Sequence, residues 1–133
     1  MDPRAVSLIR SHLAAIAANP EGFAADYFAR LFELAPSLRP LFGADLDAQS
    51  TKLAAMLDFV GRSLDRADLL TEPVSALGRR HAAYGVRSED YVVVGHALLD
   101  TLEQRMPDFT EAARAAWAEA FVLLTDLMTT DLG

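Results

Sequence analysis

Apolar residues recur every three to four positions along nearly the whole chain, and this period restricts the fold more than any other feature. Val6, Ile9, Leu13 and Ile16 form the first such stripe. A period near 3.6 places these residues on one face of an α-helix. No stretch of useful length alternates apolar and polar residues, as a half-buried strand would. The pattern therefore predicts an all-α protein.

Boundary signals divide the chain into about six main helices and one short turn helix. Asp2 and Pro3 suit the N-cap and first position of the first helix. Pro36 and Pro40 bracket a single tight turn. The apolar faces are wider than a two-stranded coiled coil needs, so we expect one globular helical domain over residues 1–133.

Composition excludes several classes of function. The 133 residues carry a net charge of −7 and no cysteine, which removes disulfides, zinc–thiolate sites and iron–sulfur clusters. Lys52 is the sole lysine, so nucleic acid and anionic membranes are poor partners. No apolar run approaches the length of a membrane span, and no basic leader precedes an apolar stretch. We therefore expect a cytoplasmic protein.

One histidine lies where its side chain could bind a buried metal or cofactor. The segment 65–71 is expected to be a charged link, and Pro73 to open a short helix after it. On that helix Leu77, His81 and Tyr84 share one apolar face. An imidazole in this position can ligate a metal or haem iron. It can equally be a core histidine bonded to a carbonyl, and the local pattern leaves both interpretations open.

Three stretches together resemble the globin family, most closely single-domain bacterial haemoglobins and the globin domain of flavohaemoglobins. They are residues 27–42 (YFARLFELAPSLRPLF), 77–86 (LGRRHAAYGV) and 91–99 (YVVVGHALL), with Trp117 as further support. Their order and spacing extend over nearly the whole chain. The resemblance implies a globin fold around a haem pocket, with haem b as the cofactor.

The resemblance also implies roles for individual residues. His81 matches the proximal iron ligand and Phe42 the ring that stacks on the haem. Gln49 and Leu53 match the distal pair, in a register counted back from His81, although a shift of one residue would place Ser50 there instead. The other residues expected to line the pocket are Phe28, Leu57, Leu77, Val86, Tyr91, Val94 and Phe121, with Arg80 at the propionate edge.

Two departures from the flavohaemoglobin pattern affect the expected chemistry. The distal tyrosine position holds Phe28, and the tyrosine lies one residue earlier, at Tyr27, about 100° round the helix. The place of a glutamate that polarises the proximal histidine holds Leu132, next to Asp131. We therefore expect a backbone carbonyl of the same helix to accept the hydrogen bond from His81.

These features predict a haem protein that binds O₂, CO and NO reversibly. It could also support nitric oxide dioxygenation with a separate reductase, since the chain ends at Gly133 without a fused one. The alternatives are a haem-based gas or redox sensor or an electron-transfer protein acting through a partner, and a haem-free helical interaction module. The expected state is a monomer or homodimer.

Overall fold

The computed structural model describes residues 1–129, which form six α-helices and one 3-10 helix. These elements are α1 (Pro3–Ala18), α2 (Pro20–Leu34), the 3-10 helix η1 (Pro36–Leu41), α3 (Leu46–Ser63), α4 (Ala67–Ala83), α5 (Asp90–Arg105) and α6 (Glu111–Thr129). The prediction of an all-α protein with about six main helices and one turn helix is confirmed.

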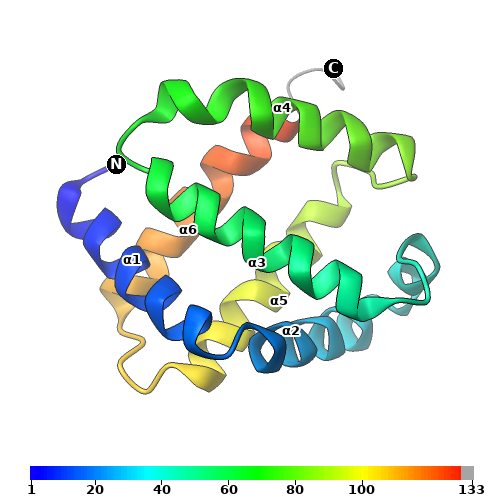
Figure 1. Cartoon of the computed structure of the whole chain (residues 1–133), viewed down its shortest axis with the longest axis horizontal. Coiled ribbons are helices and arrows are strands. Elements are labelled where there is room, and N and C mark those ends of the chain that lie inside the picture. Colours follow the sequence, from blue (N-terminus) through cyan, green and yellow to red (C-terminus); the bar gives the residue numbers. More distant parts are fainter. Residues whose placement is uncertain (130–133) are drawn as a thin grey trace.

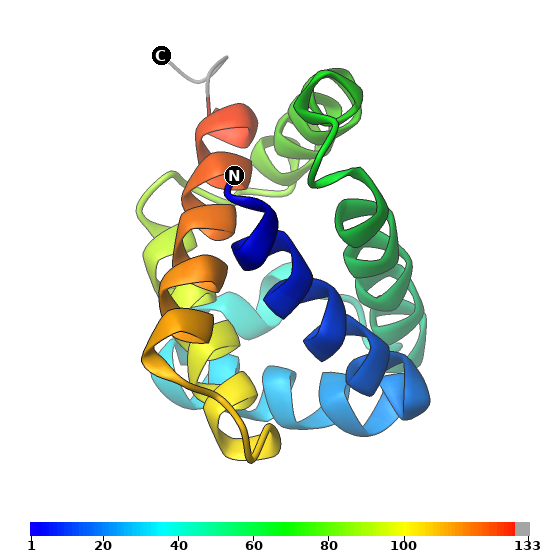
Figure 2. The same ribbon diagram turned by 90° about the vertical axis from the view of Figure 1, so that its left-hand side faces the viewer.

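The helices form two layers that are closed at one end. Figure 2 shows α5 and α6 on one side and α3 and α4 on the other, with α2 below them. α2 packs on α5, while α4 and α1 both pack on α6 (Figure 1). α3 rests on α1 and α2 and has much less contact with α4, although the two follow one another in the sequence. This arrangement leaves α3 and α4 apart.

Local sequence sets several of the helix ends. Asp2 accepts a hydrogen bond from the backbone N–H of Arg4 at 2.7 Å, and Pro3 occupies the first turn, as predicted. Asn19 caps α2 in the same way through the N–H of Gly22 at 3.1 Å. These side chains satisfy amides that the first helical turn leaves without partners.

The predicted link over residues 65–71 is wrong for most of its length. α4 begins at Ala67 and runs through Pro73, which lies inside the helix. A proline removes one helical hydrogen bond and normally disfavours such a position. Here Leu70 is fully buried one turn before the proline. Leu70 belongs to the hydrophobic core, and its burial favours a helical first turn of α4 despite the proline that follows.

The core lies among α1, α2, α5 and α6, and its largest fully buried side chains include Phe23, Leu31 and Leu102. Two ion pairs join α2 to α5 at the edge of this core, Arg30 with Asp100 at 2.9 Å and Arg105 with Asp26 at 2.5 Å. Within residues 1–129, no helix is both long enough and apolar enough to span a bilayer.

Candidate functional site

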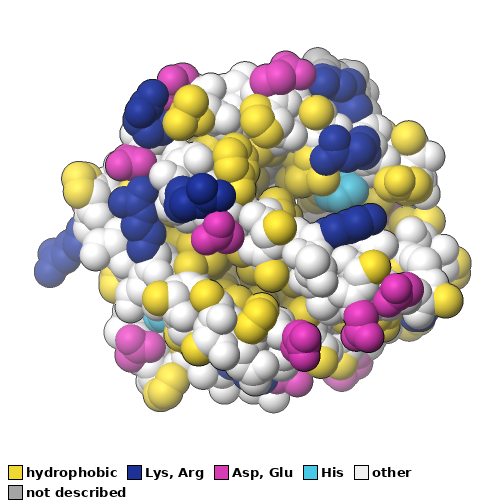
Figure 3. Space-filling model, viewed as in Figure 1, with side chains coloured by type: hydrophobic (Ala, Val, Ile, Leu, Met, Phe, Trp, Pro, Cys, Tyr) yellow, Lys and Arg dark blue, Asp and Glu magenta, His cyan; other side chains and the backbone are white. Residues whose placement is uncertain are grey.

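A hollow lined by apolar side chains opens between α3 and α4. Figure 3 shows it on the face of the molecule, with hydrophobic side chains along its walls and a histidine at its edge between basic side chains. Five of the predicted contact residues pack against the core yet stay only half-buried, namely Phe42, Leu53, Leu77, Val86 and Val94. Apolar side chains that face inward but remain partly accessible leave apolar area for a ligand to cover.

The end of α4 fixes the position of His81. The N–H of Val86 donates to the carbonyl of His81 at 3.0 Å, and the N–H of Tyr84 donates to the same carbonyl at 3.1 Å. The chain turns at Gly85, whose φ of +99° disfavours residues with a side chain. These bonds close the helix directly after the histidine and bring Val86 back beside it.

His81 pairs with Tyr91 of α5, not with a helix carbonyl, so that expectation is wrong. The His81 Nδ1 and the Tyr91 hydroxyl lie 3.2 Å apart, and their rings are tilted by 47°. The side chain of Tyr91 is long enough to cross from α5, whereas the carbonyls of α4 are used by its own helical bonds. Among the described residues, Nε2 of His81 has no hydrogen-bond partner.

Electrostatics keep both members of this pair neutral. Burial, and secondly the charge of Arg80, lower the pKa of His81 below its usual value of 6.5. Burial and the charge of Asp90 raise the pKa of Tyr91. A neutral imidazole that donates from Nδ1 keeps a lone pair at Nε2, and this is the form that can ligate a metal.

Aromatic rings of α2 cluster with the ring of Phe42, which follows η1. Phe28 of α2 contacts Phe42 edge-on, with ring centroids 5.5 Å apart, and it stacks on Phe32 at 6.0 Å. The guanidinium of Arg39 stabilises the turn after η1 by donating to the carbonyls of Phe42 and Gly43 at 3.3 Å each. The structure thus brings together Phe28 and Phe42, two of the predicted site residues. Tyr27 is also buried, and burial raises its pKa, so its hydroxyl stays protonated.

The first turns of α3 carry the predicted distal residues. Gln49 is half-buried, and Leu53 and Leu57 follow it at helical spacing. The hydroxyl of Ser50 donates to the carbonyl of Leu46 at 2.8 Å, which occupies its polar group within the helix. Among the described residues, the side-chain amide of Gln49 makes no such hydrogen bond.

Arg80 is exposed next to His81 on α4. Lys52, the chain's single lysine, is exposed on α3. Asp131 and Leu132, which bear on the proximal hydrogen bond, lie outside the described residues.

A second histidine pairing, at His12, has no motif in the sequence and was not predicted. His12 is 3% exposed, and its Nδ1 accepts a hydrogen bond at 3.0 Å from the indole N–H of Trp117. Its Nε2 lies 3.4 Å from a carboxylate oxygen of Asp108. His12 and Trp117 are 105 positions apart, so no local motif connects them.

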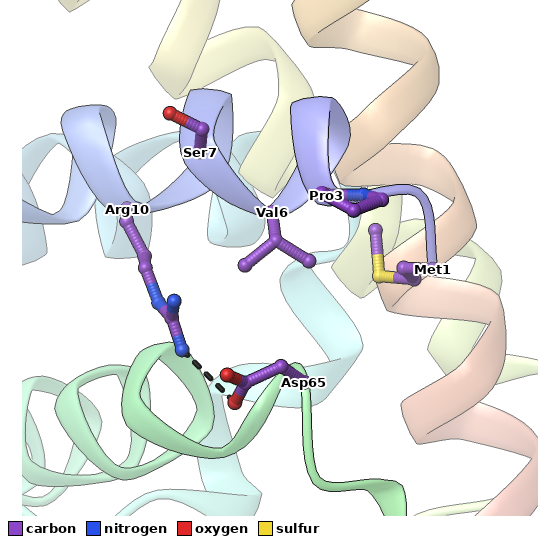
Figure 4. A pocket seen from close by; sticks show the side chains of 6 residues that line it. All are labelled: Met1, Pro3, Val6, Ser7, Arg10 and Asp65. Carbon is purple, nitrogen blue, oxygen red and sulfur yellow. Dashed lines mark hydrogen bonds and ion pairs between the residues drawn. The ribbon is translucent and has the colours of Figure 1, made fainter.

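A shallow crevice of about 350 Å³ lies at the start of α1 and carries no evident chemistry (Figure 4). Its charged groups satisfy each other, since Arg10 pairs with Asp65 at 3.1 Å and donates to the carbonyl of Gly61 at 2.8 Å. These contacts attach α1 to the end of α3.

Comparison with known proteins gives one family. A family model described as Globin matches residues 25–128. A flavohemoprotein of Vibrio cholerae is 24% identical over 126 residues, which cover 92% of this chain and 32% of that protein. Neuroglobin of Danio rerio is 28% identical over 137 residues, covering 92% of this chain and 86% of its own length. The chain thus spans about a third of the flavohemoproteins it matches.

Solved structures agree with this match. An engineered carbene transferase, made from a candidate nitric oxide dioxygenase of Rhodothermus marinus, superposes with a TM-score of 0.86 at 29% identity. It covers 98% of this chain and 92% of its own. A bacterial globin of Campylobacter jejuni reaches the same TM-score at 19% identity, covering 98% of both chains, and so shares the fold.

Proposed function

Because this chain belongs to the globin family, whose members hold haem and bind small gas ligands, we propose that it holds haem b between α3 and α4 and binds O₂, CO and NO reversibly. One observation carries the proposal. The neutral imidazole of His81 is anchored through Nδ1 to Tyr91, while Nε2 has no partner among the described residues. That nitrogen is the proposed iron ligand.

The residues around His81 fit a porphyrin. The half-buried apolar side chains of the hollow would cover its faces, with Phe42 against the ring, and would keep water out. The chain has no cysteine, so the group would be held without thioether bonds, as haem b is. Arg80 would lie near its carboxylates. When bound, haem supplies an iron centre that takes up diatomic gases reversibly.

The distal side favours release over tight retention. We assign the amide of Gln49 as the donor to a bound gas molecule, with Leu53 and Phe28 as apolar neighbours. Phe28 has no hydroxyl, so a second donor is absent from that position. One hydrogen bond contributes about 0.5–1.5 kcal/mol net, and its absence speeds release accordingly.

Nitric oxide dioxygenation, with electrons from a separate reductase, is a second candidate. It is supported by the 29% identity to the Rhodothermus marinus protein and by the similarity to flavohemoproteins. A reductase that restores ferrous haem should make nitric oxide consumption catalytic in the presence of O₂. Consumption that stops after one equivalent would remove this candidate and leave reversible gas binding.

The first experiment is the absorption spectrum of the haem-reconstituted protein in ferric, ferrous and CO-bound states. The wild-type chain should show a stoichiometric Soret band that shifts on CO binding. His81→Ala should lose the band or change its ligation, whereas His96→Ala, at an exposed position on α5, should match the wild type. A wild-type chain without haem uptake, or a spectrum indifferent to His81, would refute the proposal and favour the haem-free interaction module.

A further inference from the structure

The pair formed by His12 and Trp117 has no part in the proposed haem site, yet it joins two chemically active side chains in the core. Trp117 is the chain's one tryptophan. It is 4% exposed and His12 is 3% exposed, and their ring planes are tilted by only 21° with centroids 6.4 Å apart. Phe109 packs against the same imidazole at 5.6 Å. Both polar groups of the pair are therefore shielded from water.

The hydrogen bond fixes where the protons are. An indole N–H donates and cannot accept, so Nδ1 of His12 must carry a lone pair. A neutral imidazole then holds its proton on Nε2. That nitrogen lies 3.4 Å from a carboxylate oxygen of Asp108, whose side chain is 75% exposed. The order Trp117, His12, Asp108 therefore runs from the core to the surface, with each group oriented to pass a proton outward.

Trp117 also borders the interior of the proposed haem site. It lines a small apolar cavity of about 30 Å³ together with Leu57 and Phe121. Leu57 and Phe121 are predicted haem contacts. A porphyrin in the hollow between α3 and α4 would therefore be separated from Trp117 by these two side chains. An electron could pass between the porphyrin and the indole across this short apolar region.

We propose that Trp117 is a redox-active residue, which gives one electron to a peroxide-oxidised iron porphyrin while His12 takes its proton. When bound, an iron porphyrin would supply two electrons to peroxide, which would take up two protons from solvent and give two water molecules. Trp117 would return one of the two electrons, and the second oxidising equivalent would stay on the porphyrin. The indole N–H bond breaks and its proton moves to Nδ1 of His12, while the Nε2 proton passes to Asp108 and then to solvent. A neutral tryptophan radical and a neutral imidazole remain.

This inference rests on the proposed function for the identity of the oxidant, but the proton path can be tested without haem. The other charged groups of α1 and α6 have their own partners or lie on exposed positions, and among the described residues Asp108 is the only charged group in contact with His12. The pair therefore has one outlet for its proton.

The first test mixes the haem-reconstituted full-length protein with hydrogen peroxide and follows radicals by freeze-quench EPR. The wild type should give a neutral tryptophan radical, which Trp117→Phe should abolish. His12→Gln keeps an acceptor for the indole but no basic nitrogen, and should slow radical formation by about 100-fold. Equal rates in the wild type and His12→Gln would overturn the role of His12.

The second test uses the protein without haem. A photogenerated ruthenium(III) polypyridyl oxidant is applied to the haem-free full-length chain, and radical formation is timed in H₂O and D₂O. The wild type should be slower in D₂O, and Asp108→Asn should be slower than its matched control Asp58→Asn, a change at an exposed ion pair. No solvent isotope effect and equal rates for both variants would overturn the proton path.

Comparison of the two tests separates the two proposals. If the photochemical test succeeds and peroxide gives no Trp117 radical despite a normal Soret band, the proton path stands and the porphyrin is rejected as its oxidant. If the protein takes up no haem, the proposed function fails while the photochemical test still decides the chemistry of His12 and Trp117.

Discussion

α6 supports two helices that each carry a buried or half-buried histidine, α1 with His12 and α4 with His81. Each imidazole pairs through Nδ1 with one aromatic partner, Trp117 in the first region and Tyr91 in the second. Only His12 has a second partner among the described residues, because its Nε2 faces Asp108. We call the region around His12 closed, because both of its ring nitrogens have partners. We call the region around His81 open, because its Nε2 has no partner among the described residues.

The difference shows what makes a histidine available as a ligand. Tryptophan can only donate, so it fixes His12 with a lone pair at Nδ1 and a proton at Nε2. A tyrosine hydroxyl can accept from Nδ1, which leaves the lone pair of His81 at Nε2. The same residue type therefore becomes a structural proton acceptor in one region and a candidate metal ligand in the other.

The packing of α4 on α6 should be more sensitive to substitution than any other contact in this comparison. A Cβ atom on Gly78 would collide with the backbone of Met128, which cannot move away cheaply. We expect Gly78→Ala to lower the free energy of unfolding by about 3 kcal/mol. Gly61→Ala is the matched control, since its Cβ meets only the end of the Leu13 side chain and should cost much less. Urea titration of both variants measures the difference.

Replacement of each histidine by leucine should separate stability from ligation. His12→Leu leaves the indole N–H of Trp117 buried without an acceptor, and should lower the unfolding free energy of the haem-free protein by about 2 kcal/mol. His81→Leu removes the partner of the Tyr91 hydroxyl but replaces a half-buried polar ring with an apolar side chain. The haem-free protein should therefore lose less stability than the His12→Leu variant, and it should lose haem uptake. Equal losses of stability in the two variants would contradict the comparison.

Tyr91→Phe tests whether the open region depends on its hydroxyl. Without the acceptor, Nδ1 of His81 loses the bond that orients the ring, and haem should dissociate roughly 10-fold faster. Tyr84→Phe changes an exposed tyrosine of the neighbouring turn and should leave the rate unchanged. Transfer of haem to excess apomyoglobin gives both rates.

Phe28→Tyr would add a donor to the distal side of the open region. Gas release should slow by roughly 10-fold if the new hydroxyl bonds the ligand. Tyr27→Phe, one residue earlier, should not change the rate. The Tyr27 ring contacts Phe28 edge-on, with centroids 5.3 Å apart, but position 27 lies about 100° round the helix from position 28. Flash photolysis and stopped-flow measurement of O₂ dissociation distinguish these cases. No effect of Phe28→Tyr would exclude Phe28 from the ligand's surroundings.

The smallest expected effect concerns pH. The pKa of His81 is lower in the folded chain than its unfolded value near 6.5. The unfolded chain therefore binds more protons below that pH, so this contribution to stability is complete above pH 6.5 and is lost as the pH falls through the lowered pKa. The haem-free wild type should lose stability relative to His81→Leu between pH 7.5 and 5.5, as followed by urea midpoints.

The fold could be predicted from the sequence because each helix has its own apolar period. The start of α1 at Pro3 and the turn helix after Pro36 follow from single residues whose backbone preferences are strong. The link before α4 was predicted wrongly because Pro73 has a strong local signal, whereas the burial of Leu70 depends on tertiary packing.

The candidate site could be predicted only in part. His81 lies on a regular apolar face, so its inward position follows from spacing. Its partner Tyr91 lies across a turn on the next helix, and the choice between a hydroxyl and a carbonyl depends on how the two helices cross. The pairing of His12 with Trp117 depends on the contact of the first helix with the last, which no local pattern encodes.

The position of Trp117 beside the small cavity gives the molecule a built-in optical reporter. Because the chain has one tryptophan, all indole fluorescence comes from this single point behind Leu57 and Phe121. A porphyrin between α3 and α4 would absorb that emission by energy transfer at short range. The degree of quenching would then measure the fraction of molecules that hold a porphyrin. This measurement needs no label and works at concentrations too low for an absorption spectrum.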